Sequence, residues 1–369
     1  MKSFSSKNQR AIVAIVTNDY FHQAMVLGRS IKCFEPESDF IVFVVGYDEE
    51  DLDYQNADFT VLDAKILNPK EWRRFVFQYD GLQASCALKP LAMLHLLTEY
   101  EKVIYLDADM KLFGPLEQGW KELGGADLSL TPHSYLPIKD DGFAPARVTM
   151  RLAGIFNAGY IGVSESGSSF LKWWWEQTNY NCVAAHCRGV FLDQIYLNEA
   201  SYMVQRLAIL KDHSYNVACW NLHERGLKKT CSKKFPYLVN EKPLICFHFS
   251  SYADLIKVRP PPCGKEIFYD LYRKYNKETL LEKRKLLSSE KQYPFNYFSD
   301  GAMISVSWRE YMRRGIPELE NVKDPFLLND FTREMIEAVM VRRPGTYQPK
   351  PERENFFMLP SLVPSEEAS

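Results

Sequence analysis

The sequence has no long apolar run. Its first apolar segment, residues 11–17, follows a polar start and is too short to form the core of a signal peptide. No stretch approaches the roughly 18 consecutive apolar residues that a membrane-spanning helix requires. We therefore expect a cytoplasmic protein without a transmembrane segment, so that any contact with a membrane is peripheral.

The sequence also lacks an excess of basic charge. Its 45 Lys and Arg residues balance 47 Asp and Glu residues, which gives a formal net charge of −2. Nucleic-acid-binding domains normally carry a basic surface, so we expect no nucleic-acid partner. One lysine cluster is a candidate contact for an anionic or membrane-borne partner, although a solvated face is the ordinary interpretation. Its members are Lys228, Lys229, Lys233 and Lys234.

A disulfide framework is absent as well. The eight cysteines are scattered along a long chain that shows no export signal, so we expect reduced thiols. Cys182, His186 and Cys187 lack a second pair at the spacing of a zinc finger, and we expect no structural zinc there.

The sequence does contain a regular alternation of apolar runs and amphipathic stretches. The runs that predict strands in the first third are residues 11–17, 39–46, 59–64 and 102–109. The stretches between them that predict helices are residues 22–33 and 89–99. Such alternation is typical of the α/β class, with a mostly parallel sheet flanked by helices.

The remainder of the chain changes after residue 264 from a mixed strand and helix pattern to a helical one. Residues 154–163 and 243–249 predict further strands, and residues 168–178 and 191–200 predict a helix and the start of another. The helices expected after residue 264 are residues 265–287, 310–314 and 329–343. We therefore divide the chain into an α/β domain (1–264), a helical C-terminal region (265–346) and a flexible tail (347–369).

The strongest chemical signal is a pair of carboxylates. Asp107 and Asp109 end the strand predicted at residues 102–109, and a period of two points both side chains the same way. Ligands of parallel sheets bind beyond the carboxyl ends of the strands, which also makes residues 17–20 a candidate site. Two adjacent carboxylates repel, and Mn²⁺ or Mg²⁺ relieves that repulsion while bridging the phosphates of a nucleotide. The alternative is a pair of solvated or capping aspartates.

Six motifs stand in order between about residues 10 and 250. They are TNDY (17–20), LKPLAML (88–94), IYLDAD (104–109), FNAGYIGV (156–163), LDQIYLN (192–198) and ICFHFSS (245–251). In this order they resemble the nucleotide-sugar glycosyltransferases of the GT-A fold, specifically the family-eight type that includes glycogenin. The resemblance implies a Rossmann-like GT-A domain over residues 1–264, a UDP-sugar donor and retention of the anomeric configuration.

The resemblance also implies roles for individual residues. The residues that would contact the donor are Thr17, Asn18, Tyr20, Lys89, Asp107, Ala108, Asn157, Ala158 and Gly159. Thr17 and Asn18 would bond the base, and Tyr20 would stack on it. The residues expected beside the transferred sugar are Asp193 and Gln194, which are the predicted catalytic pair. The metal ligands would be Asp107, Asp109 and His248, around Mn²⁺ or Mg²⁺.

The chain departs from the family after the histidine. The family carries a glycine three residues on and a lysine six residues on, where this sequence has Ser251 and Asp254. A basic contact to the diphosphate is then expected from Lys257 or Arg259, and we assign Lys257 to the donor. A later segment, YFSDGAMISVSWREYMRR followed by DPF, resembles bacterial polysaccharide-cluster transferases more loosely.

The function expected from these features is metal-dependent transfer of a sugar from a nucleoside-diphosphate donor to a saccharide or other acceptor, including a lipid-linked one. The alternative is a catalytically inactive scaffold that binds a nucleotide sugar. A nucleotidyltransferase would need a Gly-rich loop after the first strand, where residues 17–23 read TNDYFHQ. A phosphatase of the Asp-x-Asp type would need Thr where Lys111 stands.

Two features leave the acceptor side open. Trp173, Trp174 and Trp175 are candidates for a sugar platform, but consecutive helical positions face three directions, so at least one is expected in the core. The helical C-terminal region is a candidate for pairing two subunits into a homodimer or for covering the acceptor site.

Overall fold

The computed structural model describes residues 8–69, 71–185, 188–250, 257–286 and 291–341 of the 369-residue chain. Within these ranges, none of the helices is long and apolar enough to cross a membrane. The flexible-tail prediction (347–369) and the residues His186, Cys187, Ser251 and Asp254 lie outside the described residues.

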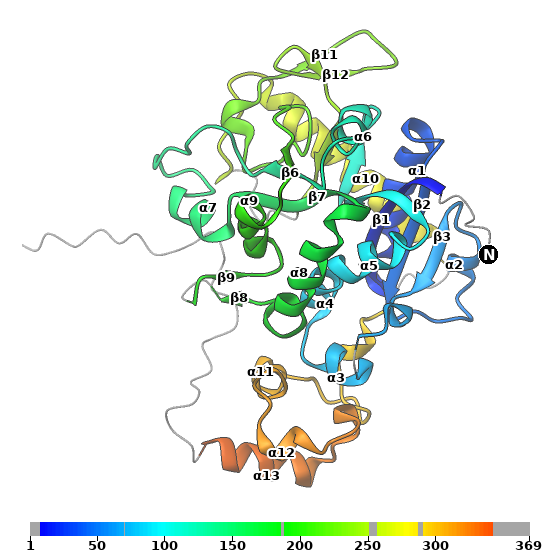
Figure 1. The fold of residues 1–369 in the computed structure, drawn as a ribbon, viewed down its shortest axis with the longest axis vertical. Coiled ribbons are helices and arrows are strands. Elements are labelled where there is room, and N and C mark those ends of the chain that lie inside the picture. Colours follow the sequence, from blue (N-terminus) through cyan, green and yellow to red (C-terminus); the bar gives the residue numbers. More distant parts are fainter. Residues whose placement is uncertain (1–7, 70, 186–187, 251–256, 287–290, 342–369) are drawn as a thin grey trace, which may run out of the picture.

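A seven-stranded sheet forms the centre of the molecule (Figure 1). Its order is β10-β6-β7-β4-β1-β2-β3, and every neighbouring pair is parallel except the two pairs that β7 makes. The strands are β1 (Asn8–Thr17), β2 (Asp39–Val45), β3 (Thr60–Asp63), β4 (Tyr100–Leu106), β6 (Leu128–Pro132), β7 (Phe156–Ser164) and β10 (Leu207–Ile209). This arrangement confirms the predicted α/β class with a mostly parallel sheet.

The sheet is buried on both faces, which explains its continuous apolar strands. Alternate residues of β1 enter two different core clusters: Ala11, Val13 and Ile15 lie in one, and Ile12, Ala14 and Val16 lie in the other. The helices packed on the first face are α4 (Gly81–Ala87), α5 (Lys89–Leu96) and α8 (Ser168–Asn181). Those on the second face are α1 (Phe21–Phe34) and α6 (Glu117–Glu122).

A small antiparallel ladder carries the chain back to the carboxyl edge of the sheet. β5 (Met110–Leu112) follows β4 and pairs with β14 (Cys246–His248). In this register His248 stands opposite Met110, one residue beyond Asp109. Residues that are 138 positions apart in the sequence are therefore brought side by side by two short strands.

The other α-helices and strands before residue 264 are short. They are α2 (Leu52–Gln55), α3 (Trp72–Phe77), α7 (Arg147–Ala153), α9 (Ala200–Met203), β8 (Ala184–Ala185), β9 (Val190–Phe191), β11 (Leu227–Lys229), β12 (Tyr237–Val239) and β13 (Lys242–Pro243).

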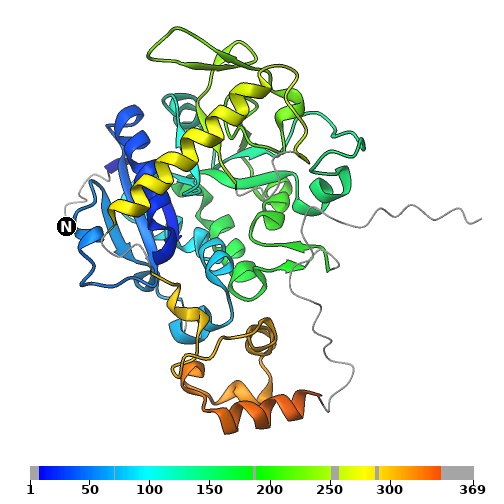
Figure 2. The same cartoon turned by 180° about the vertical axis from the view of Figure 1, so that it is seen from behind.

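The helices expected at the C-terminal end are present. α10 (Lys265–Lys285) crosses the molecule and packs on α1, where Val26 shares a core cluster with Tyr272 and Tyr275 (Figure 2). The later helices gather beyond α3, as Figure 1 shows: α11 (Val306–Arg314), α12 (Pro317–Glu320) and α13 (Asp330–Val341). The chain returns to the sheet domain between these two parts, because residues 291–296 lie against the end of β1.

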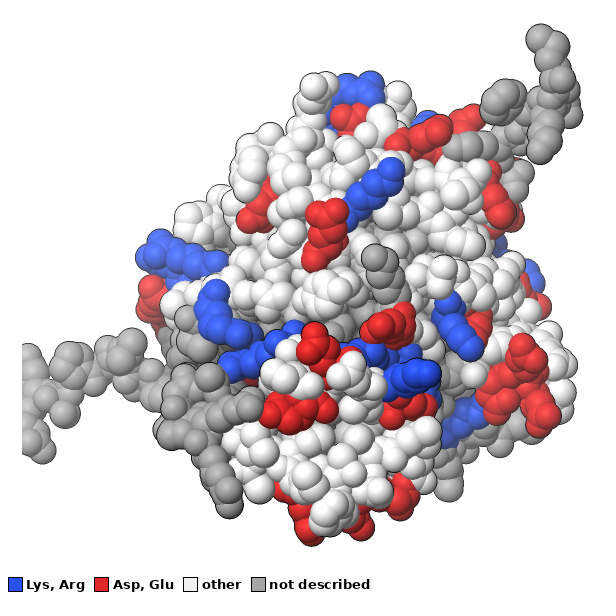
Figure 3. Space-filling model, turned by 60° about the horizontal axis from the view of Figure 1, so that its bottom comes forward, with Lys and Arg blue, Asp and Glu red and all other residues white. Residues whose placement is uncertain are grey.

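The surface seen from below mixes the two signs of charge. In Figure 3 a band of Lys and Arg side chains lies among Asp and Glu side chains. Ion pairs such as Arg73–Asp324 and Arg314–Glu310 join residues of the C-terminal region to α3 or to one another. This interspersed pattern agrees with the near-zero formal charge of the chain.

Some predicted boundaries are wrong. The strand expected over 102–109 ends at Leu106, so both aspartates lie in the turn that follows it. The strand expected over 243–249 is shortened to Cys246–His248. The helix expected to begin within 191–200 is largely a 3-10 helix, Gln194–Glu199, before α9 begins.

Candidate active and metal site

A tight turn after β4 presents the two aspartates. The N–H of Asp107 donates to the carbonyl oxygen of Gly159 at 2.9 Å, which extends the β4–β7 ladder by one residue. The N–H of Met110 then donates to the carbonyl oxygen of Asp107 at 3.0 Å and closes the turn. The side chains of Asp107 and Asp109 are about one-quarter exposed, at 26% and 23%, so the turn leaves both open to a ligand.

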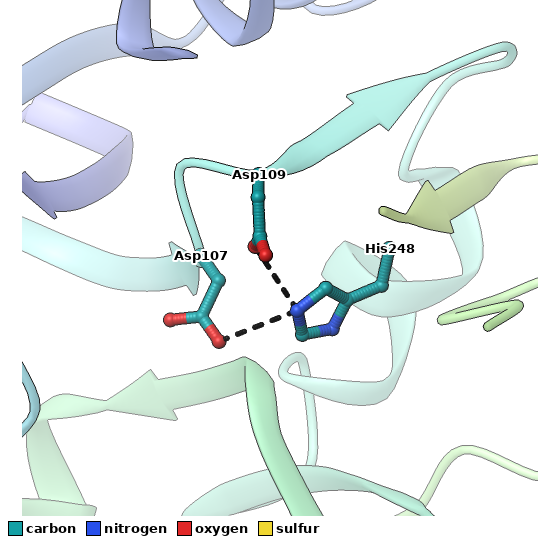
Figure 4. A group of neighbouring side chains, drawn as sticks. All are labelled: Asp107, Asp109 and His248. Carbon is teal, nitrogen blue, oxygen red and sulfur yellow. Dashed lines mark ion pairs between the residues drawn. The ribbon is translucent and has the colours of Figure 1, made fainter. Parts of the chain in front are cut away.

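His248 completes a group with metal-binding geometry (Figure 4). Its Nε2 atom lies 3.0 Å from Oδ1 of Asp109 and 3.7 Å from Oδ2 of Asp107. One ligand atom from each of the three residues lies within 4.8 Å of the others. Two carboxylates and one imidazole suit Mn²⁺ or a similar divalent cation, so the residues fit the metal that the sequence predicts.

The electrostatics of this group suit a cation. Burial alone would lower the pKa of His248, but the charge and hydrogen bond of Asp109 and the charge of Asp107 together outweigh it, and the pKa is raised above its ordinary value. Burial likewise opposes ionisation of Asp109, but His248 outweighs it, and the pKa of Asp109 is lowered.

Lys89 links the turn after β4 to Asp193, the predicted catalytic carboxylate. Its Nζ atom lies 3.0 Å from Oδ1 of Asp107 and 3.1 Å from Oδ2 of Asp193, and it donates to the carbonyl oxygen of Ala158 at 3.1 Å. Burial opposes a charged lysine, but Asp107 and Asp193 outweigh it, and the pKa of Lys89 lies well above its ordinary value. The hydroxyl of Tyr105 donates to the same oxygen of Asp107 at 2.9 Å.

Asp193 is almost fully enclosed, and it follows a residue in a strained backbone conformation. The residue before it, Leu192, has a φ of 48°, a left-handed conformation that a leucine rarely adopts. The indole N–H of Trp174 donates to the carbonyl oxygen of Asp193 at 2.9 Å. Asp193 is 2% exposed, and burial, opposed by Lys89, raises the pKa of its carboxyl.

Gly159 allows the imidazole of His248 to approach β7. A Cβ atom at this position would lie 2.5 Å from Nδ1 and 2.6 Å from Cε1 of His248, and 2.7 Å from Oδ1 of Asn157. Real Cβ atoms do not come this close, so a side chain here would displace the imidazole. The absence of a side chain at Gly159 therefore lets His248 lie against β7, and a donor contact at Gly159 stays a prediction.

Buried amides lie beside the metal group. The Nδ2 atom of Asn157 lies 3.3 Å from Oε1 of Gln194 and 3.4 Å from Nε2 of His133. His133 is 5% exposed and bonds the carbonyl oxygen of Gly154 through Nδ1 at 2.9 Å. Burial lowers the pKa of His133 to about 4, so its imidazole is neutral at ordinary pH. Asn157 and Gln194, both expected near the sugar, are thus in contact.

The expected nucleoside loop lies at the end of β1, next to β4 in the sheet. The hydroxyl of Thr17 donates to a carboxylate oxygen of Asp19 at 2.5 Å, and Tyr20 is 50% exposed. The side-chain amide of Asn18 donates to the carbonyl oxygen of Gln292 at 3.1 Å. Gln292, which follows α10 in the chain, therefore forms part of this loop's surroundings, and the sequence does not predict that contact.

Several other candidates are placed away from the metal group or are engaged elsewhere. Ala108 is buried in the core of the second sheet face. Lys257 is exposed, and its carbonyl oxygen accepts the N–H of Ala144. Arg259 forms an ion pair with Asp141 at 2.5 Å, so its charge is already matched. A diphosphate contact from Lys257 stays a prediction.

The acceptor-side candidates have ordinary structural surroundings. Trp174 is completely buried, which confirms that at least one of the three tryptophans belongs to the core, and Trp173 and Trp175 pack against the same cluster. The four lysines of the basic cluster are exposed, and Lys228 pairs with Glu241.

Three residues of the site are missing from the sequence prediction. Tyr105 shares the period-two face of Asp107, so its contact was available from the strand pattern. His133 and Asn216 follow no motif, and their contacts depend on the packing of separate loops. A hollow of about 580 Å³ lies at the opposite end of β4 and has no connection with this group; it is lined by Glu101, Ser164, Glu165 and Ser166.

Comparison with known proteins gives distant resemblances of fold. No protein-family model and no curated protein matches the sequence. The chain is 15% identical to the galactosyltransferase LgtC solved with donor and acceptor sugar analogs, over 72% of this chain and 95% of that one, with a TM-score of 0.43. It is 16% identical to the glycosyltransferase GlyE of Streptococcus pneumoniae TIGR4, over 79% and 67%, with a TM-score of 0.43.

A third resemblance is to mouse xyloside xylosyltransferase 1 in its apo form. The identity is 14%, the coverage is 65% of this chain and 97% of that one, and the TM-score is 0.38. Because all three scores lie below 0.5, these resemblances carry no conclusion about function. The function is therefore inferred from the motifs and the side chains of the site.

Proposed function

We propose that the protein is a metal-dependent GT-A-type glycosyltransferase that moves a sugar from a nucleoside-diphosphate donor, UDP being the expected nucleotide, to a saccharide-type acceptor. The observation that carries this proposal is the convergence at one edge of the sheet of a metal group with a buried lysine–carboxylate pair. Asp107, Asp109 and His248 form the first, and Lys89 and Asp193 form the second.

The metal ion, when bound, would neutralise the negative charge of the departing diphosphate. Asp107, Asp109 and His248 would hold it. In the reaction the bond between the anomeric carbon and the diphosphate oxygen breaks, and its electron pair leaves with the nucleoside diphosphate. The acceptor hydroxyl forms the new bond to that carbon, and its proton passes to the diphosphate or to water.

The buried carboxylate suits the sugar side of this reaction. Positive charge builds up on the anomeric carbon as the diphosphate leaves, and a preorganised carboxylate stabilises such charge. Asp193 is enclosed, with Gln194 beside it, and Lys89 keeps one of its oxygens in place. We propose Asp193 as the carboxylate that faces the sugar, in a reaction that retains the anomeric configuration.

The direct test is release of nucleoside diphosphate from a panel of nucleotide sugars, with Mn²⁺ and with a chelator, beside an Asp107→Ala/Asp109→Ala double variant. We expect metal-dependent release from one donor, lost in the double variant. Absence of any metal-dependent nucleotide binding would overturn the proposal.

A second variant separates the enzyme from the inactive scaffold. Asp193→Ala is expected to remove sugar transfer while metal-dependent binding of UDP is kept, because Asp193 is the sugar-side carboxylate in this proposal. Unaltered turnover in Asp193→Ala would contradict that role. Binding of a nucleotide sugar by the unchanged protein with no turnover toward any acceptor would favour the scaffold.

The finer features are proposals of the same kind. We propose that residues 1–264 form the transferase domain and that residues 265–346 form a helical C-terminal region. We further propose Thr17, Asn18 and Tyr20 as the contacts of the nucleobase. A cytoplasmic location, peripheral contact with a membrane that carries a lipid-linked acceptor, and a homodimer are consistent with this function and need separate tests.

A further inference from the structure

A chain of hydrogen bonds leads from the main chain of β7 to the imidazole of His248. The N–H of Gly159 donates to Oδ1 of Asn157 at 2.9 Å. Because a main-chain N–H only donates, this bond identifies which atom of the Asn157 amide is the oxygen. The Nδ2 atom of Asn216 donates to that same oxygen at 2.9 Å.

The orientation of the Asn216 amide follows from its two donor bonds. Its Nδ2 atom also donates to Oγ1 of Thr131 at 2.8 Å, so both hydrogens of the amide are used. The remaining atom, Oδ1, lies 3.2 Å from Nδ1 of His248. An amide oxygen only accepts, so the hydrogen of this bond belongs to Nδ1 of His248.

This assignment decides which nitrogen of His248 is free for a metal. In a neutral imidazole with its hydrogen on Nδ1, Nε2 carries the lone pair. Nε2 is the atom that faces Asp109 and Asp107 at 3.0 and 3.7 Å. Asn216 therefore favours the tautomer in which the free lone pair faces the two carboxylates.

The position of Asn216 is itself fixed by the fold. Its φ of 47° lies in the left-handed region, which asparagine tolerates better than most residues. Its carbonyl oxygen accepts the side-chain amide of Asn221 at 3.0 Å. Asn216 is 1% exposed, so water cannot readily replace the bond to His248.

We infer that Asn216 is a positioning residue that orients His248 and fixes its tautomer for metal binding. The inference rests on the metal-dependent function proposed above and adds a residue that acts on the metal through His248. Groups that orient metal-binding histidines in this way commonly change metal affinity by about 10–100-fold when they are removed.

The same asparagine also reaches the sugar side of the site. The Asn157 amide that accepts from Asn216 donates through Nδ2 toward Oε1 of Gln194 at 3.3 Å. A change at Asn216 that keeps its acceptor but removes its donor should therefore spare the metal and disturb Gln194. This separation gives the inference two distinct readouts.

The first test is the Mn²⁺ affinity of Asn216→Ala, measured with UDP present by loss of the free-ion electron paramagnetic resonance signal. We expect binding about tenfold weaker or worse, and a weaker signal from nitrogen coordinated to the bound Mn²⁺. Asn240→Ala is the matched control, because Asn240 has the same φ of 47° and bonds Glu224 and Gly226 instead of His248.

The second test is Asn216→Asp, which keeps an oxygen facing Nδ1 of His248. We expect Mn²⁺ affinity and the nitrogen signal to stay within about threefold of the unchanged protein, since a carboxylate accepts the same hydrogen. The kcat of transfer should fall, because an oxygen would then face Oδ1 of Asn157 where Nδ2 now donates.

The outcomes separate this inference from the proposed function. No Mn²⁺ binding by the unchanged protein overturns the proposed function and this inference with it. Binding by the unchanged protein that Asn216→Ala leaves intact overturns the inference alone. An equal loss of Mn²⁺ affinity in Asn216→Asp and Asn216→Ala also overturns it, and this comparison stands even if the alanine variant is poorly folded.

Discussion

Lys89 and Asp193 form an ion pair that is shielded from solvent: Nζ lies 3.1 Å from Oδ2, and each side chain is 3% exposed. On its other side Lys89 contacts Asp107 at 3.0 Å. A buried charge group of this kind is stable only while its members remain matched, because each unmatched charge keeps its desolvation cost. Lys89 and Asp193 are therefore expected to contribute both to the stability of the site and to its proposed chemistry.

Lys89→Met is expected to lower the free energy of unfolding by about 3 kcal/mol, because it leaves Asp193 buried without its cation. Urea unfolding measures this change. The double variant Lys89→Met/Asp193→Asn should recover much of the stability, since the buried negative charge is also removed. A double variant as unstable as the sum of the two single variants would contradict this explanation.

Gly159→Ala is expected to weaken Mn²⁺ binding about tenfold or more, because the added Cβ would displace the imidazole of His248. Calorimetric titration with Mn²⁺ in the presence of UDP measures this. Gly125→Ala is the matched control, since nothing lies within 4 Å of a Cβ at that position. Equal affinities in the two variants would show that the close approach is unimportant for the metal.

His133 should make the protein less stable in acid. Its folded-state pKa is lowered to about 4 from an ordinary 6.5, so between these values the unfolded chain binds the extra proton. Stability is therefore expected to fall as the pH drops through this window, by about 3 kcal/mol in all from this residue. Urea unfolding of the wild type and His133→Gln across about pH 7 to pH 4 isolates the effect, and parallel curves would contradict it.

Bound ligands should stabilise the fold only together with the metal. At a concentration about 100 times its Kd, UDP with Mn²⁺ is expected to add about 2.7 kcal/mol to the free energy of unfolding and to raise Tm. A chelator should reverse the shift, and Asp107→Ala/Asp109→Ala should show none. A shift of equal size with chelator present would mean that UDP binds without the metal group.

Arg309 should contribute more to stability than an exposed arginine of the same helix. Its guanidinium is buried and donates to the carbonyl oxygens of Phe77, Tyr79 and Phe295. Arg309→Met is expected to cost about 3 kcal/mol because these acceptors lose their donor. Arg314→Gln breaks a partly exposed pair with Glu310 and should cost under about 1 kcal/mol. Thermal unfolding of both variants makes the comparison, and similar costs would contradict it.

The sheet and the pair of carboxylates could be predicted because their signals are local. The strands are apolar on both faces, and the pair Asp107–Asp109 lies next to the end of one of them. His248 could be predicted as a metal ligand only from its motif. Its position beside Asp109 depends on the pairing of β5 with β14. A ladder between segments so distant in sequence has no local signal.

The parts that sequence reasoning missed depend on contacts between loops. Asn216 is itself a left-handed residue outside any repeating pattern, and His133 follows the last residue of β6. The sequence predicts strand through Asp109 because the period-two pattern of side chains continues to that residue. In the structure, the hydrogen bond from the N–H of Met110 to the carbonyl oxygen of Asp107 closes a turn there. Period alone does not distinguish these two cases.

The bond between Asn18 and Gln292 has a consequence for how the protein is made. The two residues are separated by 274 positions, so a chain emerging from a ribosome exposes Asn18 long before its partner exists. Pro294, two residues after Gln292, lies close to Gly46. The proposed nucleoside loop is thus synthesised well before the segment that completes its surroundings.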